Sequence, residues 1–442
     1  MTAQPVVAER HTIASTREPL SHHFSGRWRK VGWAAVALLA AVYLVQVLTP
    51  LRIDNDSVVY LKVALQLAGE DTESGGQVPL GYPAAVAGLV QIGLANPEAL
   101  VLLNAAFLLL GFAAVWWIAR DVSPTVRVVA IALSLLSYPI VRVNVMPHPD
   151  AMGFGLTLLA VAMMSSVTSA RSRRNAMLIL GAMVVTLITA TVRVAALVLV
   201  FPLAWCVLRV VVPDDASRRT KILIAVAIVA VLGLGVTVAL LLSEHGTFSR
   251  YVLEVQAVRR RSPFDQLVNR ISIMLRGIAE VMLNFPTSRL PQVRSHLWML
   301  GIIPALFFFA TRKLAPWTRP VSVYVVAYLF MLTVWPFFTT RLWVPFIPLI
   351  ILHATHVAFE LRHRRVLRSV LALCAGWLVI TGIVALAYTS RISFAGENFR
   401  ARWGRNGGMA HPGHEASGHN QRAVEVIRRF DKENPAWRTL LN

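Results

Sequence analysis

Residues 31–50 read VGWAAVALLAAVYLVQVLTP, and residues 51–60 continue as LRIDNDSVVY. The first of these two stretches carries no charged side chain and is long enough to cross the hydrocarbon core of a bilayer. It follows a polar, basic N-terminal segment, and no small-residue cleavage site comes after it before Arg52, so we interpret it as an uncleaved anchor rather than a signal peptide. The second stretch places two carboxylates, Asp54 and Asp56, directly after this anchor.

The composition of the whole chain is that of a membrane protein. Of 442 residues, 56% are hydrophobic and 15% are charged. The formal net charge of +21 invites a nucleic-acid partner, but the basic residues cluster in short loops between apolar runs, which is typical of membrane topology and not of a duplex-binding face. With only Cys206 and Cys374, the chain has no disulfide framework and no zinc site built from four cysteines.

Apolar runs of about spanning length recur along the chain and predict an all-α polytopic membrane protein with eleven transmembrane helices. The runs lie at 31–50, 98–119, 126–143, 150–169, 176–192, 194–212, 221–243, 296–311, 320–338, 342–360 and 366–388. A shorter stretch at 79–94 opens with Pro-Leu-Gly-Tyr-Pro and is either a twelfth span or a helix lying at the membrane interface.

The positive-inside rule separates these two topologies. With eleven spans and a cytoplasmic N-terminus, the strongly basic short loops all face the cytoplasm; they lie near 120–127, 171–174, 218–221, 312–313 and 362–365. We therefore expect 79–94 to be a juxtamembrane helix and the C-terminus to be external. The predicted organisation is a cytoplasmic segment 1–30, a transmembrane domain 31–390 and a short external tail 391–442.

Two longer loops, 51–97 and 244–295, then lie outside. In the second loop apolar side chains recur at helical spacing, which predicts a helix that lies on the outer leaflet or packs on neighbouring spans. These side chains are Phe264, Leu267, Ile271, Met274, Leu275, Ile278, Met282 and Phe285. The tail has too few apolar residues for a sizeable core, and its three histidines fit a solvated linker better than a metal site. We expect a small or partly disordered appendage there.

Carboxylates at the predicted outer surface are the first candidates for chemistry. Asp54 and Asp56 follow the first span, and one of them would suit the role of a general base that takes a proton from an acceptor hydroxyl. Aspartate also commonly caps a helix, so either residue could cap the helix expected to run through Tyr60. Asp150, in Met146-Pro-His-Pro-Asp150, starts the fourth span on the same side and has the same two alternatives. Together with His148, the carboxylates would also suit a divalent metal ion, although the spacing supplies no third ligand.

Three arginines are candidates for binding a phosphate. Arg193 lies at a break between two apolar runs, Arg341 at the outer end of the tenth span, and Arg261 in the second external loop. Arginine at membrane depth is costly without a partner, and a guanidinium can grip two oxygens of a lipid phosphate. The alternative for each is that the side chain snorkels to the headgroups.

The motifs Asp-Ser-x-x-Tyr-x-x-x-Ala (56–64) and Pro-x-Gly-Tyr-Pro (79–83) resemble the first external loop of polytopic glycosyltransferases of the GT-C superfamily, in the protein O-mannosyltransferase and aminoarabinose-transferase branch. The start of the fourth span at Asp150 and the sequence Arg-Leu-Trp-Val-Pro-Phe-Ile-Pro (341–348) are similar to later features of that family. The resemblance implies that Asp56 is the catalytic base, assisted by Asp150 and Asp54, with Tyr60, Tyr82 and His148 lining the substrate pocket.

The resemblance also implies the reaction. A sugar such as mannose or arabinofuranose would pass, with inversion, from a polyprenyl-phosphate donor to a cell-envelope glycan, glycolipid or protein. The expected enzyme is a multi-pass protein of the bacterial inner membrane that works on the external face among membrane lipids, with no nucleic-acid partner and no certain cofactor. A transporter or a flippase for lipid-linked sugars is the alternative, because such proteins also hold charged residues at membrane depth.

Overall fold

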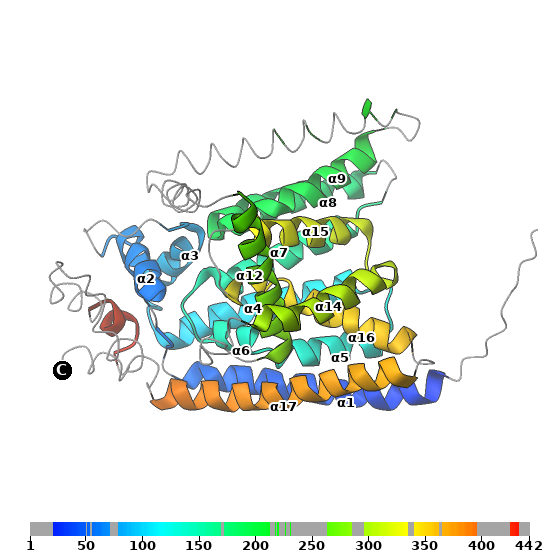
Figure 1. Ribbon diagram of the computed structural model, residues 1–442. Helices are drawn as coiled ribbons and strands as arrows, with labels where there is room; N and C mark the ends of the chain where they lie inside the picture. Colours follow the sequence, from blue (N-terminus) through cyan, green and yellow to red (C-terminus); the bar gives the residue numbers. More distant parts are fainter. Residues whose placement is uncertain are drawn as a thin grey trace, which may run out of the picture.

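The computed structural model describes residues 21–49, 51–53, 55–70, 78–168, 172–212, 263–284, 296–334, 340–361, 365–395 and 425–432, with a few isolated positions between 217 and 230. Within these residues the chain forms helices and no strands, which confirms the predicted all-helical class for the described part. Most of the helices lie along one common direction, which runs across Figure 1.

The first half of the bundle contains α1 (Ser21–Val45), η1 (Gln46–Leu48), α2 (Asn55–Leu67), α3 (Gly81–Gln91), α4 (Pro97–Ile118), α5 (Pro124–Leu135), α6 (Tyr138–Asn144), α7 (Pro149–Ser165), α8 (Arg173–Val192), η2 (Val194–Leu199) and α9 (Val200–Val211). The second half contains α12 (Pro263–Leu283), α14 (Leu297–Thr311), η4 (Arg312–Leu314), α15 (Arg319–Val334), η5 (Thr340–Trp343), α16 (Ile347–Glu360) and α17 (Arg365–Ala395). Both predicted domain boundaries fall inside a helix: residue 30 lies in α1 and residue 390 in α17.

Six helices of the described part are long and apolar enough to cross a membrane, or seven if α5 and α6 count as one bent span. They begin at Arg29, Pro97, Arg173, Val194, Leu297 and Arg365. Three shorter apolar helices, α7, α15 and α16, lie among them. The predicted span 221–243 lies outside the described residues.

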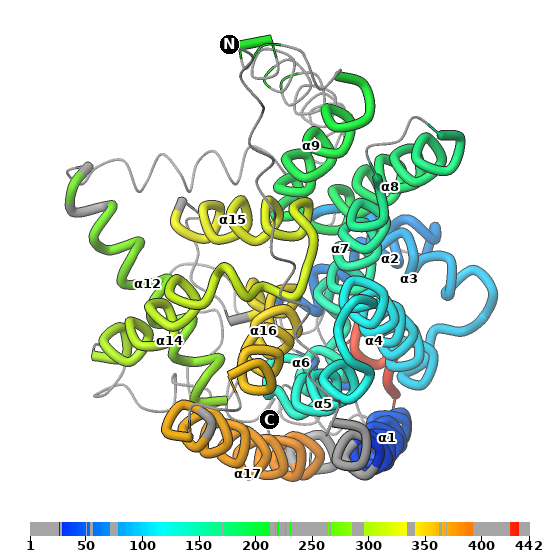
Figure 2. The backbone as a smooth tube through the Cα atoms, turned by 90° about the vertical axis from the view of Figure 1, so that its right-hand side faces the viewer, coloured from blue at the N-terminus to red at the C-terminus, as the bar shows by residue number. Residues whose placement is uncertain are grey.

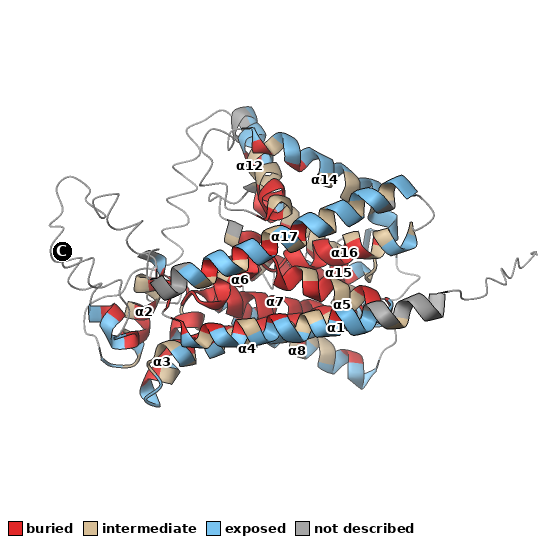
Figure 3. Ribbon diagram, turned by 90° about the horizontal axis from the view of Figure 1, so that it is seen from below, coloured by how far each residue is buried: buried red, intermediate tan, exposed pale blue. Residues whose placement is uncertain are grey.

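The outer surface of the bundle is apolar, as expected for a protein in contact with lipid. Figure 3 shows burial concentrated in the middle, with exposed faces on the outer helices α1, α14 and α17. On α17, Val366, Leu373 and Ile380 recur every seven residues and are 80%, 75% and 62% exposed. Such a continuous apolar face would be a liability in water. The described part is therefore that of a helical membrane protein.

Two predicted spans differ from a plain helix. The span expected at 126–143 is two helices bent by 67°, and Pro139 lies in the first turn of the second helix, where its missing N–H costs no helical hydrogen bond. Asn284, at the end of α12, satisfies the broken backbone: its Oδ1 accepts from Tyr138 N at 2.5 Å and its Nδ2 donates to Leu136 O at 3.0 Å. The span expected at 342–360 begins as the 3-10 turn η5 and becomes α-helical only at Ile347.

Helices α2 and α3 lie together at one end of the bundle, at the left of Figure 1; we call it the α2–α3 end. The eleven residues of α3 measure about 16 Å, which is too short to cross a core of about 30 Å. This agrees with a juxtamembrane helix at 79–94. Helix α12 lies across the direction of α1 and α17, and its first half exposes Phe264, Leu267 and Ile271 while its second half is buried against α14. The second half therefore packs on neighbouring helices, which was one of the two alternatives for this helix.

The direction of the outermost helices constrains the topology. Following the colours in Figure 1, α1 and α17 run the same way, and both finish at the α2–α3 end. Segment 425–432 also lies there, because Leu51 N donates a 2.9 Å hydrogen bond to Asp431 Oδ2. Seen along the bundle in Figure 2, α1 and α17 both lie on the side of α5 and α6. If both cross the membrane, the number of crossings from α1 to α17 is odd.

Candidate functional site

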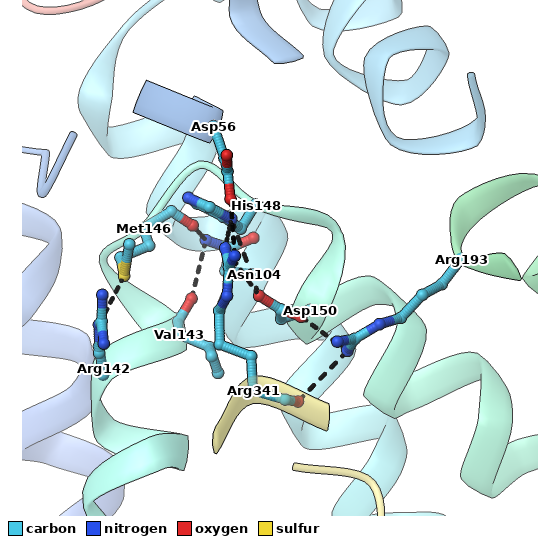
Figure 4. A network of polar contacts seen from close by, with 9 residues as sticks. All are labelled: Asp56, Asn104, Arg142, Val143, Met146, His148, Asp150, Arg193 and Arg341. Carbon is cyan, nitrogen blue, oxygen red and sulfur yellow. Dashed lines mark hydrogen bonds and ion pairs between the residues drawn. The ribbon is translucent and has the colours of Figure 1, made fainter. Parts of the chain in front are cut away.

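Four segments that are far apart in the sequence meet at the α2–α3 end: the first turn of α2, the first turn of α7, the break between α8 and η2, and η5. Figure 4 shows the side chains that they bring together, Asp56, His148, Asp150, Arg193 and Arg341. Hydrogen bonds and ion pairs join all five into one continuous network.

Asp150 is the buried centre of this network. It lies in the first turn of α7, where the helix dipole favours a negative charge, and only 2% of the residue is exposed. The N-cap of α7 is His148, which makes no side-chain capping bond, so the alternative that Asp150 is the cap is wrong. Oδ1 of Asp150 instead pairs with Arg193 NH1 at 2.6 Å. Oδ2 of Asp150 lies 3.8 Å from Arg341 NH1 and 3.8 Å from His148 Nδ1.

Arg193 reaches Asp150 because the helix breaks at this residue. Its backbone is extended (φ −154°, ψ 118°) between α8 and η2, as the sequence break predicted. The aliphatic part of its side chain lies over Gly153 of α7, with Cδ 3.5 Å from where a Cβ would stand. The same NH1 that pairs with Asp150 also donates to the backbone carbonyl of Arg341 at 3.4 Å. This arginine is therefore held by protein groups and does not snorkel to headgroups.

Arg341 connects the buried part of the site to the exposed part. Its NH2 pairs with Asp56 Oδ2 at 2.6 Å, and its NH1 lies 2.5 Å from His148 Nδ1. A guanidinium has only donors, so Nδ1 of His148 accepts and its ring proton lies on Nε2. The side chain of Arg341 is 25% exposed, against 3% for Asp150. Arg341 is thus a cation that both solvent and a ligand can reach.

Asp56 is the most accessible acidic group of the site. Its side chain is 54% exposed, and it points from the first turn of α2 towards Arg341. One turn further along α2, Tyr60 packs edge-on against Tyr82 of α3, with ring centroids 6.0 Å apart, and lies 5.8 Å from the ring of His148. The predicted pocket residues Tyr60, Tyr82 and His148 are therefore neighbours.

The Pro-x-Gly-Tyr-Pro motif has a structural reason at its glycine. A Cβ on Gly81 would stand 2.7 Å from Thr191 Oγ1 and 2.8 Å from Val192 N, at the end of α8. Only glycine allows α3 to approach so closely to the residues that precede Arg193. The motif thus fixes the position of Tyr82 in α3 relative to Arg193 at the end of α8.

A set of buried amides beneath the site was not predicted from the sequence. Nδ2 of Asn104 in α4 lies 2.8–3.3 Å from the carbonyl oxygens of Val143, Asn144 and Met146, which lead into His148. Nδ2 of Asn144 in turn donates to Oε1 of Gln46 at 2.8 Å. The available signal was a single asparagine inside an apolar run, since polar groups at membrane depth need partners.

Two predicted site residues, Asp54 and Arg261, lie outside the described residues. Within the described ranges, no three histidine, cysteine, aspartate or glutamate side chains gather closely enough to hold a metal ion. Here Asp56 and Asp150 each face a guanidinium instead.

The arrangement suits a reaction on an anionic substrate. It offers an exposed carboxylate, Asp56, that can accept a proton, beside two guanidiniums, Arg193 and Arg341, that can hold phosphate oxygens. The buried Asp150 holds Arg193 in place and faces Arg341. Comparison of the chain with protein-family models and with curated proteins gives no match.

Proposed function

We propose that this protein is a membrane glycosyltransferase that moves a sugar from a polyprenyl-phosphate donor to an acceptor hydroxyl. The observation that carries the proposal is the position of Arg341 between the exposed Asp56 and the buried pair of Asp150 with Arg193. It unites a base and a phosphate-binding group in one site at one end of an apolar bundle.

Asp56 acts as the base in the proposed reaction. The acceptor oxygen attacks the anomeric carbon, the bond from that carbon to the phosphate oxygen breaks, and the acceptor proton passes to Asp56. Asp150 is 2% exposed and engaged with Arg193, so its role is to orient the two arginines rather than to meet the acceptor. Attack opposite the leaving phosphate gives inversion at the anomeric carbon.

Arg341 and Arg193 hold the donor phosphate. The leaving polyprenyl phosphate gains negative charge as the sugar departs, and guanidiniums stabilise that charge best where water is scarce. Arg341 NH2 is bonded to Asp56 in the structure, so a phosphate oxygen would take the place of the Asp56 carboxylate. The exchange leaves Asp56 free beside the bound donor.

The topology supports the same proposal. In Figure 1 the long helices α1, α4, α5, α7, α8 and α9 alternate in direction, as do α14, α15, α16 and α17, and α9 and α14 both lead away from the α2–α3 end. The predicted span 221–243 would supply the return between them, for eleven crossings in all, as in the GT-C superfamily. The basic residues Arg120, Arg173, Arg312 and Lys313 stand at helix ends opposite the site. By the positive-inside rule, this arrangement supports a site on the external face, and we propose that the membrane is the bacterial inner membrane, as the family resemblance implies.

The substrates follow from this location and from the family resemblance. The donor carries mannose or a pentose such as arabinofuranose, and the acceptor is a cell-envelope glycan, a glycolipid or an exported protein.

Transfer of label from a panel of polyprenyl-phosphate sugars to membrane acceptors, by purified protein, tests the proposal. Wild type should transfer label, and Asp56→Asn should lose at least about a hundredfold in rate, as expected for loss of a general base. Asp121→Asn is the matched control, because it makes the same isosteric change on an exposed aspartate at the opposite end of α4. No transfer from any donor would contradict the proposal, and movement of a lipid-linked sugar across vesicles without transfer would identify a flippase.

A further inference from the structure

The C-terminal residues 425–432 are packed against the segment that carries Asp56. Val426, Ile427 and Phe430 are 5%, 0% and 1% exposed. They belong to the same apolar cluster as Leu61 and Leu65 of α2, and Tyr82 of α3. The tail was expected to be a small or partly disordered appendage; segment 425–432 is instead part of the fold at the α2–α3 end.

Polar contacts attach segment 425–432 on both sides of α2. Before the helix, Leu51 N donates to Asp431 Oδ2 at 2.9 Å in a buried setting. After the helix, Glu70 accepts two hydrogen bonds from Arg429, Nε to Oε2 and NH2 to Oε1, both at 2.7 Å. Asp431 and Arg429, two residues apart in the tail, thus bind the two ends of segment 51–70.

Segment 51–70 is also attached to the candidate site itself. Arg52 N donates to Val145 O at 2.9 Å, three residues before His148, and Asp56 pairs with Arg341 at 2.6 Å. The order along the chain is therefore an anchor at Leu51, a site contact at Asp56 and a second anchor at Glu70. An anchored helix holds its first turn at a fixed distance from Arg341.

We propose that segment 425–432 is a positioning element of the site, in which Asp431 and Arg429 hold α2 so that Asp56 stays within reach of substrate. Asp431 contacts Leu51 before α2 and Arg429 contacts Glu70 after it, so both act through α2. The catalytic consequence rests on the proposed function, whereas the anchoring itself does not. A misplacement of about 1 Å in a catalytic group can lower a rate about a hundredfold, so loss of the anchors should affect turnover.

The test combines hydrogen exchange with kinetics on the full chain in membranes or detergent. Asp431→Ala should raise exchange of the Leu51 amide, and Arg429→Glu should raise exchange in peptides covering 55–70, while α4 and α7 stay as protected as in wild type. The same variants should lower kcat by about ten- to a hundredfold, with the KM for the donor within about twofold of wild type, because neither residue binds the donor.

A swap of the charges at positions 70 and 429 distinguishes a loss of positioning from a general loss of fold. Glu70→Arg combined with Arg429→Glu restores opposite charges and should recover most of the kcat lost in Arg429→Glu alone. The control is Glu425→Arg, a charge reversal at an exposed residue of the same segment that makes no polar contact within the described part. It should change neither exchange nor kcat.

The outcomes test the positioning role of segment 425–432 separately from the proposed glycosyltransferase function. Unchanged exchange of 51–70 in Asp431→Ala and Arg429→Glu, or wild-type kcat in both, would overturn the positioning role. If wild type transfers no sugar from any donor, the proposed function fails, and the exchange data alone then decide whether the anchors hold α2.

Discussion

At the scale of single residues, the properties of the site depend on which side chains bond to the guanidinium groups of Arg341 and Arg193. Arg341 bonds Asp56 and His148, and Arg193 bonds Asp150, at distances of 2.5–2.6 Å. The pair of Arg341 with Asp56 is partly exposed and can exchange with a ligand. The pair of Arg193 with Asp150 is nearly enclosed, so removing either charge leaves the other buried without a counter-charge.

Asp56→Asn should bind polyprenyl phosphate more tightly than wild type while it fails to transfer sugar. In wild type the phosphate has to displace the Asp56 carboxylate from Arg341, and a partly exposed ion pair contributes about 0.2–1 kcal/mol. Removing that competition should lower the dissociation constant up to about fivefold, measured by equilibrium binding at low salt. An unchanged or weaker affinity in Asp56→Asn, beside wild-type affinity in Asp121→Asn, would show that Arg341 does not hold the phosphate.

Asp150→Asn should destabilise the protein strongly, because it leaves Arg193 with an unbalanced charge in an enclosed position. Breaking one partner of a buried pair costs about 3–5 kcal/mol. Thermal unfolding in detergent would show the loss. The double variant Asp150→Asn with Arg193→Met removes both charges and should recover stability, but not transfer; recovery of both would contradict the donor-binding role of Arg193.

At the scale of elements, α12 supports η5, the turn that carries Arg341. A Cβ on Gly277 would clash with Nε1 of Trp343, whose side chain is buried two residues after Arg341. Tyr328 of α15 supports the same turn from another side by donating to the Leu342 carbonyl. The position of Arg341 thus depends on α12 and α15.

Gly277→Ala should therefore reduce donor binding, although alanine favours a helix by about 1 kcal/mol over glycine. The added methyl group has to push Trp343, and with it η5 and Arg341, away from Asp56. The matched control is Gly376→Ala in α17, where an added Cβ meets nothing within 4 Å. We expect the control to keep wild-type KM and gain slightly in thermal stability; equal kinetics in the two variants would contradict a supporting role for α12.

The contact between segment 425–432 and Glu70 should weaken at acidic pH. Hydrogen bonds from Arg429 lower the pKa of Glu70 below its usual value of 4.5. The stabilisation is therefore complete above the pKa of the unfolded state and is lost as the pH falls through the lowered pKa of the folded state. Because both side chains are about 40% exposed, the effect should be well below 1 kcal/mol. Hydrogen exchange of 55–70 at decreasing pH would show it, and Glu70→Gln should abolish the pH dependence.

At the scale of the whole molecule, the proposed topology puts the site and the basic loops on opposite sides of the membrane. Single cysteines at Glu70 and at Asp121, in a background with Cys206→Ala and Cys374→Ala, should differ in labelling of intact cells by a membrane-impermeant thiol reagent. The cysteine at 70 should react from outside and the one at 121 only after permeabilisation. Labelling of both from the same side would contradict a bundle that spans the membrane.

Much of the helical layout was predictable because it depends on local sequence patterns. Apolar runs and their basic flanks indicated where helices start and end, and the break at Arg193 was visible as a charge between two such runs. The bend between α5 and α6 and the late start of α16 were missed, although Pro139 and Pro348, each in the first turn of its helix, were signals in the sequence that the helix starts there. Asn104 and the tail contacts of Asp431 and Arg429 were missed because their partners lie far away in the sequence.

The sequence by itself determined that this is a helical, membrane-type chain with acidic first turns at Asp56 and Asp150 and arginines near the ends of apolar runs. These are properties of composition, periodicity and charge, which act over a few turns of helix. Only the tertiary structure decided that Asp56 pairs with Arg341, 285 positions away, and that Leu51 bonds Asp431, 380 positions away. Such pairs depend on how whole helices pack and on which end of the bundle each one reaches, and local patterns do not contain that information.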